Sequence, residues 1–399
     1  MASATDTATL KPSREALRAL AVLGGFALAA TAAAYLHAVQ WNHAIPRDGS
    51  TLVVGRDFLN FWMYGRAAWL PEPGRWYDVT LYQRELAALL GAGYPGQNWS
   101  YPPSVMPIAA PFGLIGYLPA LGLWTLAGLA LFLAVARRQL DDTTAFAAVA
   151  LSPAVIFCVI SGQSSLITAA MLLGIFAWLD RRPAAAGVLI GLLTLKPQLG
   201  VLFPFFLVAS ARWTVFASAA VTTLALAGIT AALFGFDVWL AFVTQGLAVQ
   251  NIVLSDPQRI ATPYYPTIFM NLRGLDLPYA AAMAVQLVFT AAAVALVCWL
   301  GFARRGAGGR ETAALFLACS VAAVPYMLSY DTLALCTAAV ALLAAGTLDT
   351  RGQWLVRLVY WLPLLQVGLG QLHIPGAALI PPLFAVYLAS RLHAAAPTR

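Results

Sequence analysis

Two ionisable side chains stand out in a chain that carries few charges. Asp57 begins the segment Asp57-Phe-Leu-Asn60-Phe-Trp-Met-Tyr64, in which Asp57, Asn60 and Tyr64 recur at helical spacing and so share one face. Lys196, in Leu-Lys-Pro-Gln, is the only lysine after Lys11 and stands between two apolar segments. A carboxylate can accept a proton from a hydroxyl group, and an ammonium group can balance the charge of a phosphate.

Each candidate also has a purely structural interpretation. Asp57 could cap a helix, because aspartate is favoured at helix N-termini, and Lys196 could extend its ammonium group to a membrane surface. Asp78, in Trp-Tyr-Asp, is the main rival to Asp57 as a base, and it could equally cap a helix over 79–90. Gln163, in Ser-Gly-Gln-Ser-Ser, and Asp331, in Ser-Tyr-Asp, could likewise be helix-end residues.

The remaining candidates are cationic or aromatic. Arg259 and Arg273 could add positive charge beside Lys196, while Tyr64 and Tyr101 could contact a ligand or belong to an interfacial aromatic belt. The four histidines and four cysteines show no metal-ligand spacing, and P-loop, GxSxG, HExxH and Rossmann motifs are missing. We therefore expect neither a metal nor a cofactor.

Membrane helices must position these residues. Of the 399 residues, 61% are hydrophobic and 10% are charged, whereas a soluble domain carries about 25% charged residues. The apolar runs span roughly 18–22 residues, enough to cross a hydrocarbon core. The formal net charge of +7 comes from dispersed pairs such as Arg137-Arg138, Arg181-Arg182 and Arg304-Arg305, a pattern typical of cytoplasmic loops rather than nucleic-acid binding. The sequence predicts an all-α polytopic membrane protein.

The basic pairs also predict a topology. With a cytoplasmic N-terminus, a helix over 17–38 leads to a first extracytoplasmic loop at 39–103. The block 104–136 could cross once or twice, and the charges favour one crossing, with 104–116 dipping and 118–136 spanning. The remaining spans are expected near 143–160, 164–179, 183–195, 198–210, 213–234, 278–302, 311–328, 332–347, 353–371 and 374–391. This gives about twelve transmembrane helices, a second extracytoplasmic loop at 235–276, and both ends in the cytoplasm.

Short motifs follow one another in a fixed order: an early aspartate in DFLNFWMYGRAAW, then PEPGRWYD, YPP, SGQSS, LKPQ and SYD. This ordered set, which covers nearly the whole chain, resembles glycosyltransferase family 87, mannosyltransferases of the GT-C type that use polyprenol-phosphate sugars. The family usually has a Gly-Leu-Tyr-Asp-like tract after the first helix, from which Trp76 departs. The resemblance implies one GT-C transmembrane domain over 1–399.

The resemblance also implies an activity. In the family an aspartate of the first outer loop is the expected general base, and Asp57 occupies that position. The donor would be a polyprenyl-phosphate sugar, the transferred unit a hexose such as mannose, the acceptor a lipid or glycan, and the outcome inversion. Such an enzyme would lie in a bacterial plasma (inner) membrane, with its active site facing the periplasm or exterior.

A polytopic transporter or a flippase for lipid-linked sugars is the alternative. Twelve helices and a helix broken near Lys196 would suit a transporter, but the halves show no internal repeat and the first loop is long and aromatic. A structural membrane subunit without catalysis is a third interpretation. An enzyme of the proposed kind predicts that Asp57, Lys196 and Arg259 converge on one outward cavity that opens towards lipid.

Overall fold

The computed structural model describes residues 6–99, 101–255, 265–303 and 309–394. Its α-helices are α1 (Asp6–Ala38), α2 (Arg56–Ala67), α3 (Val79–Leu90), α4 (Met106–Ala109), α5 (Tyr117–Gln139), α6 (Thr143–Ala150), α7 (Pro153–Ser161), α8 (Ser165–Trp178), α9 (Pro183–Leu192), α10 (Phe203–Ala209), α11 (Trp213–Phe234), α12 (Asp237–Ala241), α13 (Leu247–Ser255), α15 (Ile268–Gly274), α16 (Tyr279–Ala303), α17 (Arg310–Ala323), α18 (Leu333–Ala344), α19 (Thr350–Gln371) and α20 (Ile380–Ala394).

Short 3-10 turns connect these helices. They span Arg75–Tyr77, Pro103–Val105, Ala110–Leu114, Leu193–Leu195, Pro197–Leu199, Ser329–Thr332 and Pro375–Leu379, and a π-helical turn spans Phe242–Gly246. The described residues contain no β-strand, only isolated bridges in the first loop. The prediction of an all-α polytopic membrane protein is confirmed.

Only some of the helices are long enough to span a membrane. Five segments of the described chain are long and apolar enough to cross a bilayer, namely Arg14–Ala38, Tyr117–Gln139, Trp213–Phe234, Tyr279–Ala303 and Pro375–Ala394. The bent pair α6–α7, which turns by 41°, would make six. The other expected spans are present as shorter or less apolar helices, so a count of twelve crossings stays a prediction.

Prolines explain one break inside an expected span, 143–160, and one break between two expected spans, 183–195 and 198–210. Pro153 separates α6 from α7, and Pro197 follows a break between α9 and the segment that leads to α10. The residue before a proline is driven to extended backbone, and Lys196 accordingly has φ −137° and ψ 77°. Broken helices at membrane depth are tolerated where protein covers them, and Lys196 is only 2% exposed.

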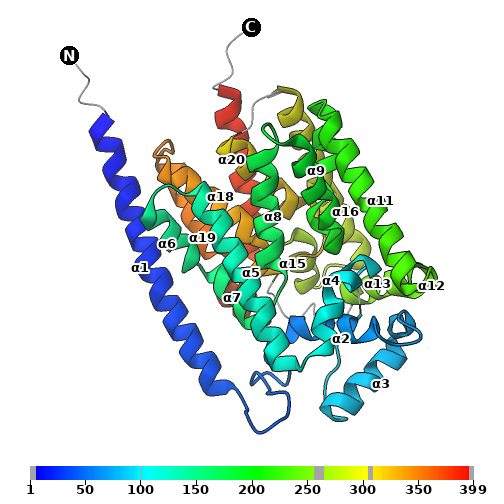
Figure 1. The fold of residues 1–399 in the computed structure, drawn as a ribbon. Helices are drawn as coiled ribbons and strands as arrows, with labels where there is room; N and C mark the ends of the chain where they lie inside the picture. The colour runs from blue at the N-terminus through cyan, green and yellow to red at the C-terminus, as the bar shows by residue number, and fades with distance from the viewer. Residues whose placement is uncertain (1–5, 100, 256–264, 304–308, 395–399) are drawn as a thin grey trace.

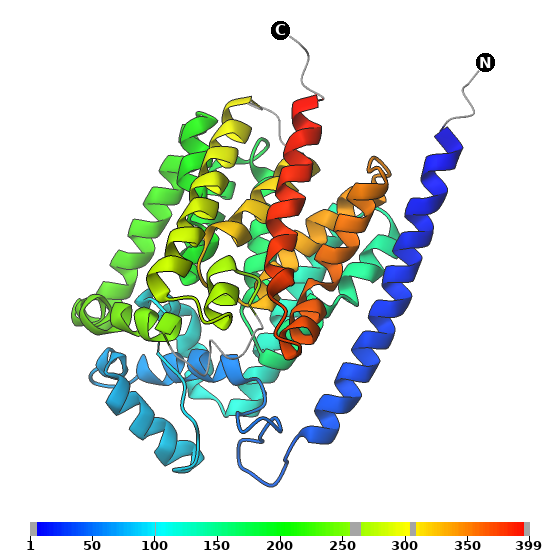
Figure 2. The same cartoon turned by 180° about the vertical axis from the view of Figure 1, so that it is seen from behind.

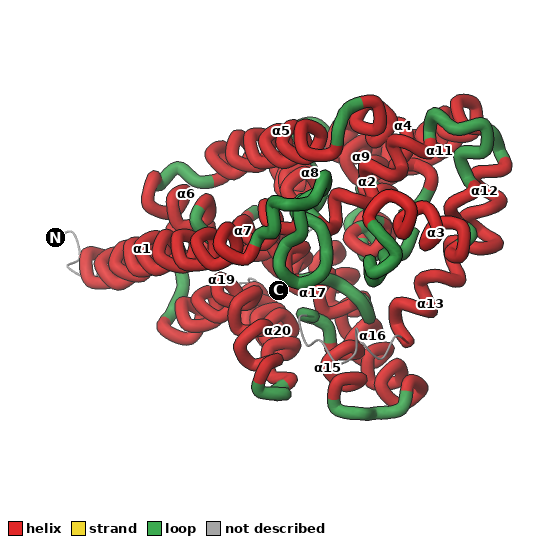
Figure 3. The backbone as a smooth tube through the Cα atoms, turned by 90° about the horizontal axis from the view of Figure 1, so that it is seen from below, coloured by secondary structure: helices red, strands yellow, loops and turns green. Residues whose placement is uncertain are grey.

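The two ends of the bundle differ. The described start of α1 and the described end of α20 lie at the same end, and the helices of the first loop, α2 and α3, lie at the opposite end together with α12 and α13 (Figure 1). Viewed from that end, α2 and α3 neighbour α12 and α13 (Figure 3). In both side views α1 stands at the edge of the bundle (Figure 2). The two predicted outer loops therefore meet on one face.

The block 104–136 forms one short irregular segment and one long helix. The 3-10 turns Pro103–Val105 and Ala110–Leu114 flank α4, and α5 follows. This arrangement agrees with a single crossing preceded by a dipping segment. Only Tyr117–Gln139 within the block has spanning length.

The first loop has a hydrophobic core of its own, and α2 runs through it. Phe58, Phe61 and Tyr64 are at most 2% exposed. Gly65 meets Gly113 so closely that a Cβ on Gly113 would lie 2.1 Å from the Gly65 carbonyl carbon. The dipping segment, through α4 and the turn Ala110–Leu114, packs against α2. The apolar side chains of α2 are therefore buried inside the protein.

Candidate active site

A cavity of about 560 Å³ lies where the first loop meets the ends of the bundle helices. Its polar wall contains residues of every motif that the sequence singled out except PEPGRWYD: Asp57, Asn60, Gln97, Asn98, Tyr101, Gln163, Lys196, Gln198, Tyr330 and Asp331. Its apolar wall includes Val201, Phe242, Leu247, Leu254, Val324 and Leu328. A cavity lined by both polar and apolar side chains suits a ligand that is polar at one end and hydrocarbon at the other.

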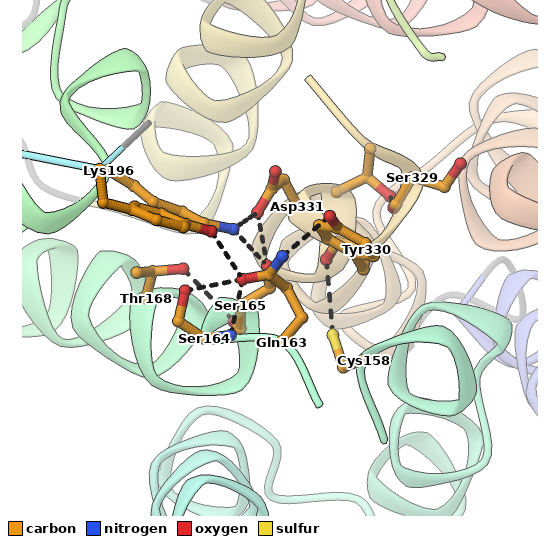
Figure 4. A network of polar contacts seen from close by, with 11 residues as sticks. Cys158, Gln163, Ser164, Ser165, Thr168, Lys196, Ser329, Tyr330 and Asp331 are labelled. Atoms are coloured by element: carbon orange, nitrogen blue, oxygen red, sulfur yellow. Dashed lines mark hydrogen bonds and ion pairs between the residues drawn. The ribbon is translucent and has the colours of Figure 1, made fainter. Parts of the chain in front are cut away.

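Lys196 and Asp331 form a buried ion pair in this wall (Figure 4). The Lys196 Nζ atom lies 2.7 Å from Asp331 Oδ1, and both side chains are 3% exposed. Ser165 bridges them, because its hydroxyl donates to Asp331 and accepts from Lys196 Nζ at 3.0 Å. The ammonium group also lies 5.1 Å from the centre of the Tyr330 ring. Lys196 therefore does not reach out to a membrane surface, and Asp331 is its counter-ion rather than a helix cap.

A second set of hydrogen bonds joins the same motifs (Figure 4). Gln163 Nε2 donates to the Tyr330 hydroxyl at 2.8 Å, and Gln163 Oε1 accepts from both the backbone N–H and the hydroxyl of Ser164. The Tyr101 hydroxyl donates to Gln163 Oε1 at 3.4 Å. Gly162 makes this turn possible, since its φ of 62° lies in the left-handed region that favours glycine. The turn between α7 and α8 is thus held by its side chains in one orientation.

Asp57 lies at the start of α2 but does not cap it. The N-cap is Gly55, with φ 66°, and no side chain provides the capping hydrogen bond. The Asp57 Oδ2 atom is buried and accepts no hydrogen bond from the described part of the chain. A buried acceptor without a partner costs about 1–3 kcal/mol. Asp57 also lines the cavity, so one of its carboxylate oxygens has a hydrogen-bonding capacity that no described residue uses.

The polar wall next to Asp57 is fixed by hydrogen bonds within the first loop. Asn60 Nδ2 donates to the Asn98 carbonyl at 3.0 Å, and the Tyr82 hydroxyl donates to Asn60 Oδ1. Gln97 Nε2 donates to the Arg56 carbonyl at 2.7 Å. These bonds tie the two ends of the first loop together, so that α2 presents Asp57 and Asn60 to the cavity in a set orientation.

The structure brings five of the predicted site residues together: Asp57, Tyr101, Gln163, Lys196 and Asp331. Arg259 lies outside the described residues. Tyr64 is 0% exposed and stacks on Trp99 with ring centroids 3.6 Å apart, so it belongs to the core of the loop. Arg273 donates to the Leu277 carbonyl at 2.6 Å and is not part of the cavity wall.

Asp78 caps a helix, which is the structural alternative to a role as the base. Its carboxylate accepts from the backbone N–H groups of Thr80 and Leu81, at 2.8 and 3.1 Å, and caps α3. It does not line the cavity. The geometry therefore favours Asp57 over Asp78 as the base, and it does not support Asp78 as a ligand-binding residue.

The amino-acid sequence also matches a family model. The model of glycosyltransferase family 87 matches residues 99–324, more than half of the chain. The chain belongs to glycosyltransferase family 87. Comparisons with curated proteins and with solved structures found no match. The protein is accordingly a membrane glycosyltransferase, and this favours an enzyme over a transporter.

The family 87 match covers only part of the site. Tyr101, Gln163 and Lys196 lie inside the matched range, whereas Asp57 and Asp331 lie outside it. The case for these two carboxylates therefore rests on geometry. In the described part of the chain no group of three histidine, cysteine, aspartate or glutamate side chains could hold a metal ion.

Three further residues of this glycosyltransferase site were not identified from the sequence. Ser165 belongs to the motif SGQSS and Tyr330 to the motif SYD. Only the folded chain shows that Ser165 contacts Lys196 and that Tyr330 contacts both Gln163 and Lys196. Arg56 precedes Asp57 directly. Burial opposes its charge, but the neighbouring Asp57 carboxylate and Tyr330 raise the pKa of the Arg56 guanidinium above its ordinary value. The adjacent Arg-Asp pair was the signal that could have revealed Arg56.

Proposed function

We propose that this family 87 enzyme transfers a hexose, with mannose as the expected sugar, from a polyprenyl-phosphate donor to a lipid or glycan acceptor. The transfer takes place at the extracytoplasmic face and inverts the anomeric centre. The observation that carries the proposal is the unpartnered Asp57 Oδ2 atom at a cavity that also contains the Lys196–Asp331 pair.

Asp57 acts as the general base. The acceptor hydroxyl oxygen forms a bond to the anomeric carbon, and its proton passes to the Asp57 carboxylate. The bond between the anomeric carbon and the phosphate oxygen breaks, and the electron pair leaves with the polyprenyl phosphate. Because the phosphate is a stable anion, no acid is needed to protonate it. Attack from the side opposite the leaving group inverts the anomeric centre.

The cations balance the charge that the leaving phosphate gains. A lysine ammonium group has three N–H donors, and Ser165 and Asp331 accept two of those of Lys196. The third can be donated to a phosphate oxygen. Asp331 thus holds the ammonium group in place, but its carboxylate also neutralises part of the positive charge of Lys196. Arg56 provides a second positive charge near Asp57.

The apolar wall supports a lipid-linked donor. Val201 and Leu247 line the cavity and are 45% and 46% exposed. Around α12 and α13, Phe236, Leu240 and Val243 are also more than half exposed. Exposed apolar side chains beside a cavity are suited to contact with hydrocarbon. A polyprenyl chain can remain in the bilayer there while its phosphate and sugar enter the polar wall.

The test is direct transfer by the purified full chain in liposomes. Polyprenyl-phosphate mannose labelled in the sugar is supplied with a membrane lipid extract as acceptor source. The expected result is labelled glycolipid or glycan together with released polyprenyl phosphate, and none of this product with Asp57→Asn. Label transferred from a nucleotide sugar but not from the polyprenyl donor would overturn the donor assignment. Movement of the donor across the bilayer without transfer would instead support a flippase.

A further inference from the structure

A second cavity lies between α5, α8 and α9, far from the candidate active site. Its volume is about 440 Å³, within the range of about 300–1,000 Å³ that is typical of ligand pockets. Ser165, at the first position of α8, belongs to the active site, whereas Trp178, at the last position, lines the second cavity. Thirteen residues of helix separate them by about 20 Å. The two sites therefore lie at opposite ends of α8.

The floor of this cavity is apolar and its rim is basic. Apolar side chains of α5, α8 and α9 form the floor, including Val135, Met171, Ala177 and Leu189. Three exposed arginines form the rim: Arg138, Arg181 and Arg182. The α8 helix packs against both α5 and α9, so the groove runs along α8 between its two neighbours.

The carboxylates nearest to these arginines in sequence are engaged elsewhere. Asp180 lies 2.6 Å from Arg212, and Asp141 lies 3.5 Å from Arg310. Asp142 accepts the backbone N–H of Ala145 at 2.8 Å and caps α6. In the described part of the chain no carboxylate pairs with Arg138, Arg181 or Arg182. Three positive charges at the mouth of the groove therefore have no carboxylate partner among the described residues.

We propose that this groove binds one anionic phospholipid, with its phosphate between Arg138, Arg181 and Arg182 and an acyl chain on α8. Basic pockets between membrane helices bind anionic lipids, because each arginine near the membrane surface attracts the negatively charged headgroup. The apolar floor accounts for the chain, and the arginine rim accounts for the charge. The bound lipid would hold together α5, α8 and α9. At the far end of this group, α8 begins at Ser165 and α9 ends at Leu192, four residues before Lys196.

The test counts lipids bound to the purified full chain by native mass spectrometry. Phosphatidylglycerol, phosphatidylcholine and polyprenyl phosphate are titrated separately. We expect one tightly held phosphatidylglycerol and no comparable phosphatidylcholine. Each change of Arg138, Arg181 or Arg182 to alanine should weaken this binding roughly fivefold, and the triple variant about 100-fold. The matched control is Arg351→Ala, since Arg351 is exposed, lies at the start of α19 and does not line the groove.

A second variant separates a bound lipid from a diffuse charge effect. Ala177→Phe fills the groove without changing its charge, and it should reduce phosphatidylglycerol binding while the melting temperature shows a folded protein. Equal retention of phosphatidylglycerol and phosphatidylcholine would overturn the proposal. So would unchanged binding in the folded Ala177→Phe variant, or binding of polyprenyl phosphate that is lost together with phosphatidylglycerol binding in the triple arginine variant.

Discussion

The ammonium group of Lys196 lies 2.7 Å from the carboxylate of Asp331, although 135 residues separate them in the chain. Both side chains are 3% exposed. Removing one member of a buried pair leaves an uncompensated charge and costs about 3–5 kcal/mol. The pair is therefore a structural element of the site as well as a source of positive charge, and single substitutions mix these two roles.

A double substitution separates the two roles of the Lys196–Asp331 pair. Lys196→Met and Asp331→Asn should each lower the melting temperature strongly, and the combination should regain most of that loss because no charge is left unpaired. If Lys196 binds the donor phosphate, the folded double variant should still use the donor roughly 10–150-fold less well, the value of one charge-assisted contact. Thermal unfolding and donor KM measure the two effects. Normal donor kinetics in the double variant would assign the pair to structure alone.

Asp57→Asn should abolish most turnover while the protein stays folded. The substitution keeps the size of the side chain but removes the proton acceptor, and loss of a general base costs on the order of 10²–10⁴ in rate. Because Asp57 Oδ2 has no hydrogen-bond partner in the described chain, its change should lower the melting temperature only through the lost attraction to Arg56. The control is Asp48→Asn, in the same loop, where the carboxylate accepts from Ser50. Near-normal turnover of Asp57→Asn would remove Asp57 from the mechanism.

Asp78 should respond as a helix cap. Asparagine retains capping ability, so Asp78→Asn should be close to neutral in both stability and turnover. Asp78→Ala should cost about 1 kcal/mol of stability, with turnover retained in the folded fraction. Chemical unfolding and initial rates give the two readouts. An inactive but stable Asp78→Asn variant would move the base from Asp57 to Asp78.

The contact between Gly65 and Gly113 should tolerate no side chain. A Cβ on Gly65 would lie 2.3 Å from the Ala109 carbonyl oxygen, and that atom belongs to backbone that cannot rotate away. Gly65→Ala and Gly113→Ala should each destabilise the protein by about 1–3 kcal/mol. Gly122→Ala is the matched control, because a Cβ there meets nothing within 4 Å. Equal melting temperatures for all three variants would show that α2 can shift without loss.

Reporter fusions test which face holds the cavity. Fusions after Arg138, Arg182 and Arg212 should report the cytoplasm, and one after Tyr94 should report the outside, because short basic loops remain inside. The described start of α1 and end of α20 lie at the end opposite α2 (Figure 1). An external signal after both Tyr94 and Arg138 would mean that 104–136 crosses twice and that the predicted count of about twelve crossings is wrong.

Local sequence signals predicted the parts of the site that depend on neighbouring residues. The glycine turn of SGQSS, the proline break after Lys196 and the start of α2 near Asp57 all follow from backbone preferences. The convergence of these motifs on one cavity was predicted from the family resemblance and not from the residues themselves. Hydrophobic patterning predicted the helices well, but not which of them cross a bilayer fully, because burial inside the protein lets a broken helix stay at membrane depth.

Long-range contacts explain the predictions that failed. Tyr64 shares a helix face with Asp57, yet Trp99 covers it once the loop folds back. The pairing of Asp331 with Lys196 depends on where α8, α9 and the turn before α18 meet, and no local pattern encodes that meeting. The family model, which ends at residue 324, does not reach Asp331 either.

The order of synthesis adds a consequence to the separation of Lys196 and Asp331. At roughly 5–20 residues per second, the 135 residues from Pro197 to Asp331 take on the order of 7–27 s to translate. During that interval the insertion machinery handles a lysine that has Ser165 but no counter-charge. We expect nascent chains that end before Asp331 to keep the segment around Lys196 accessible to water and to be preferred targets of membrane proteases. Completion of the ion pair would then mark the step at which a newly made chain becomes resistant to degradation.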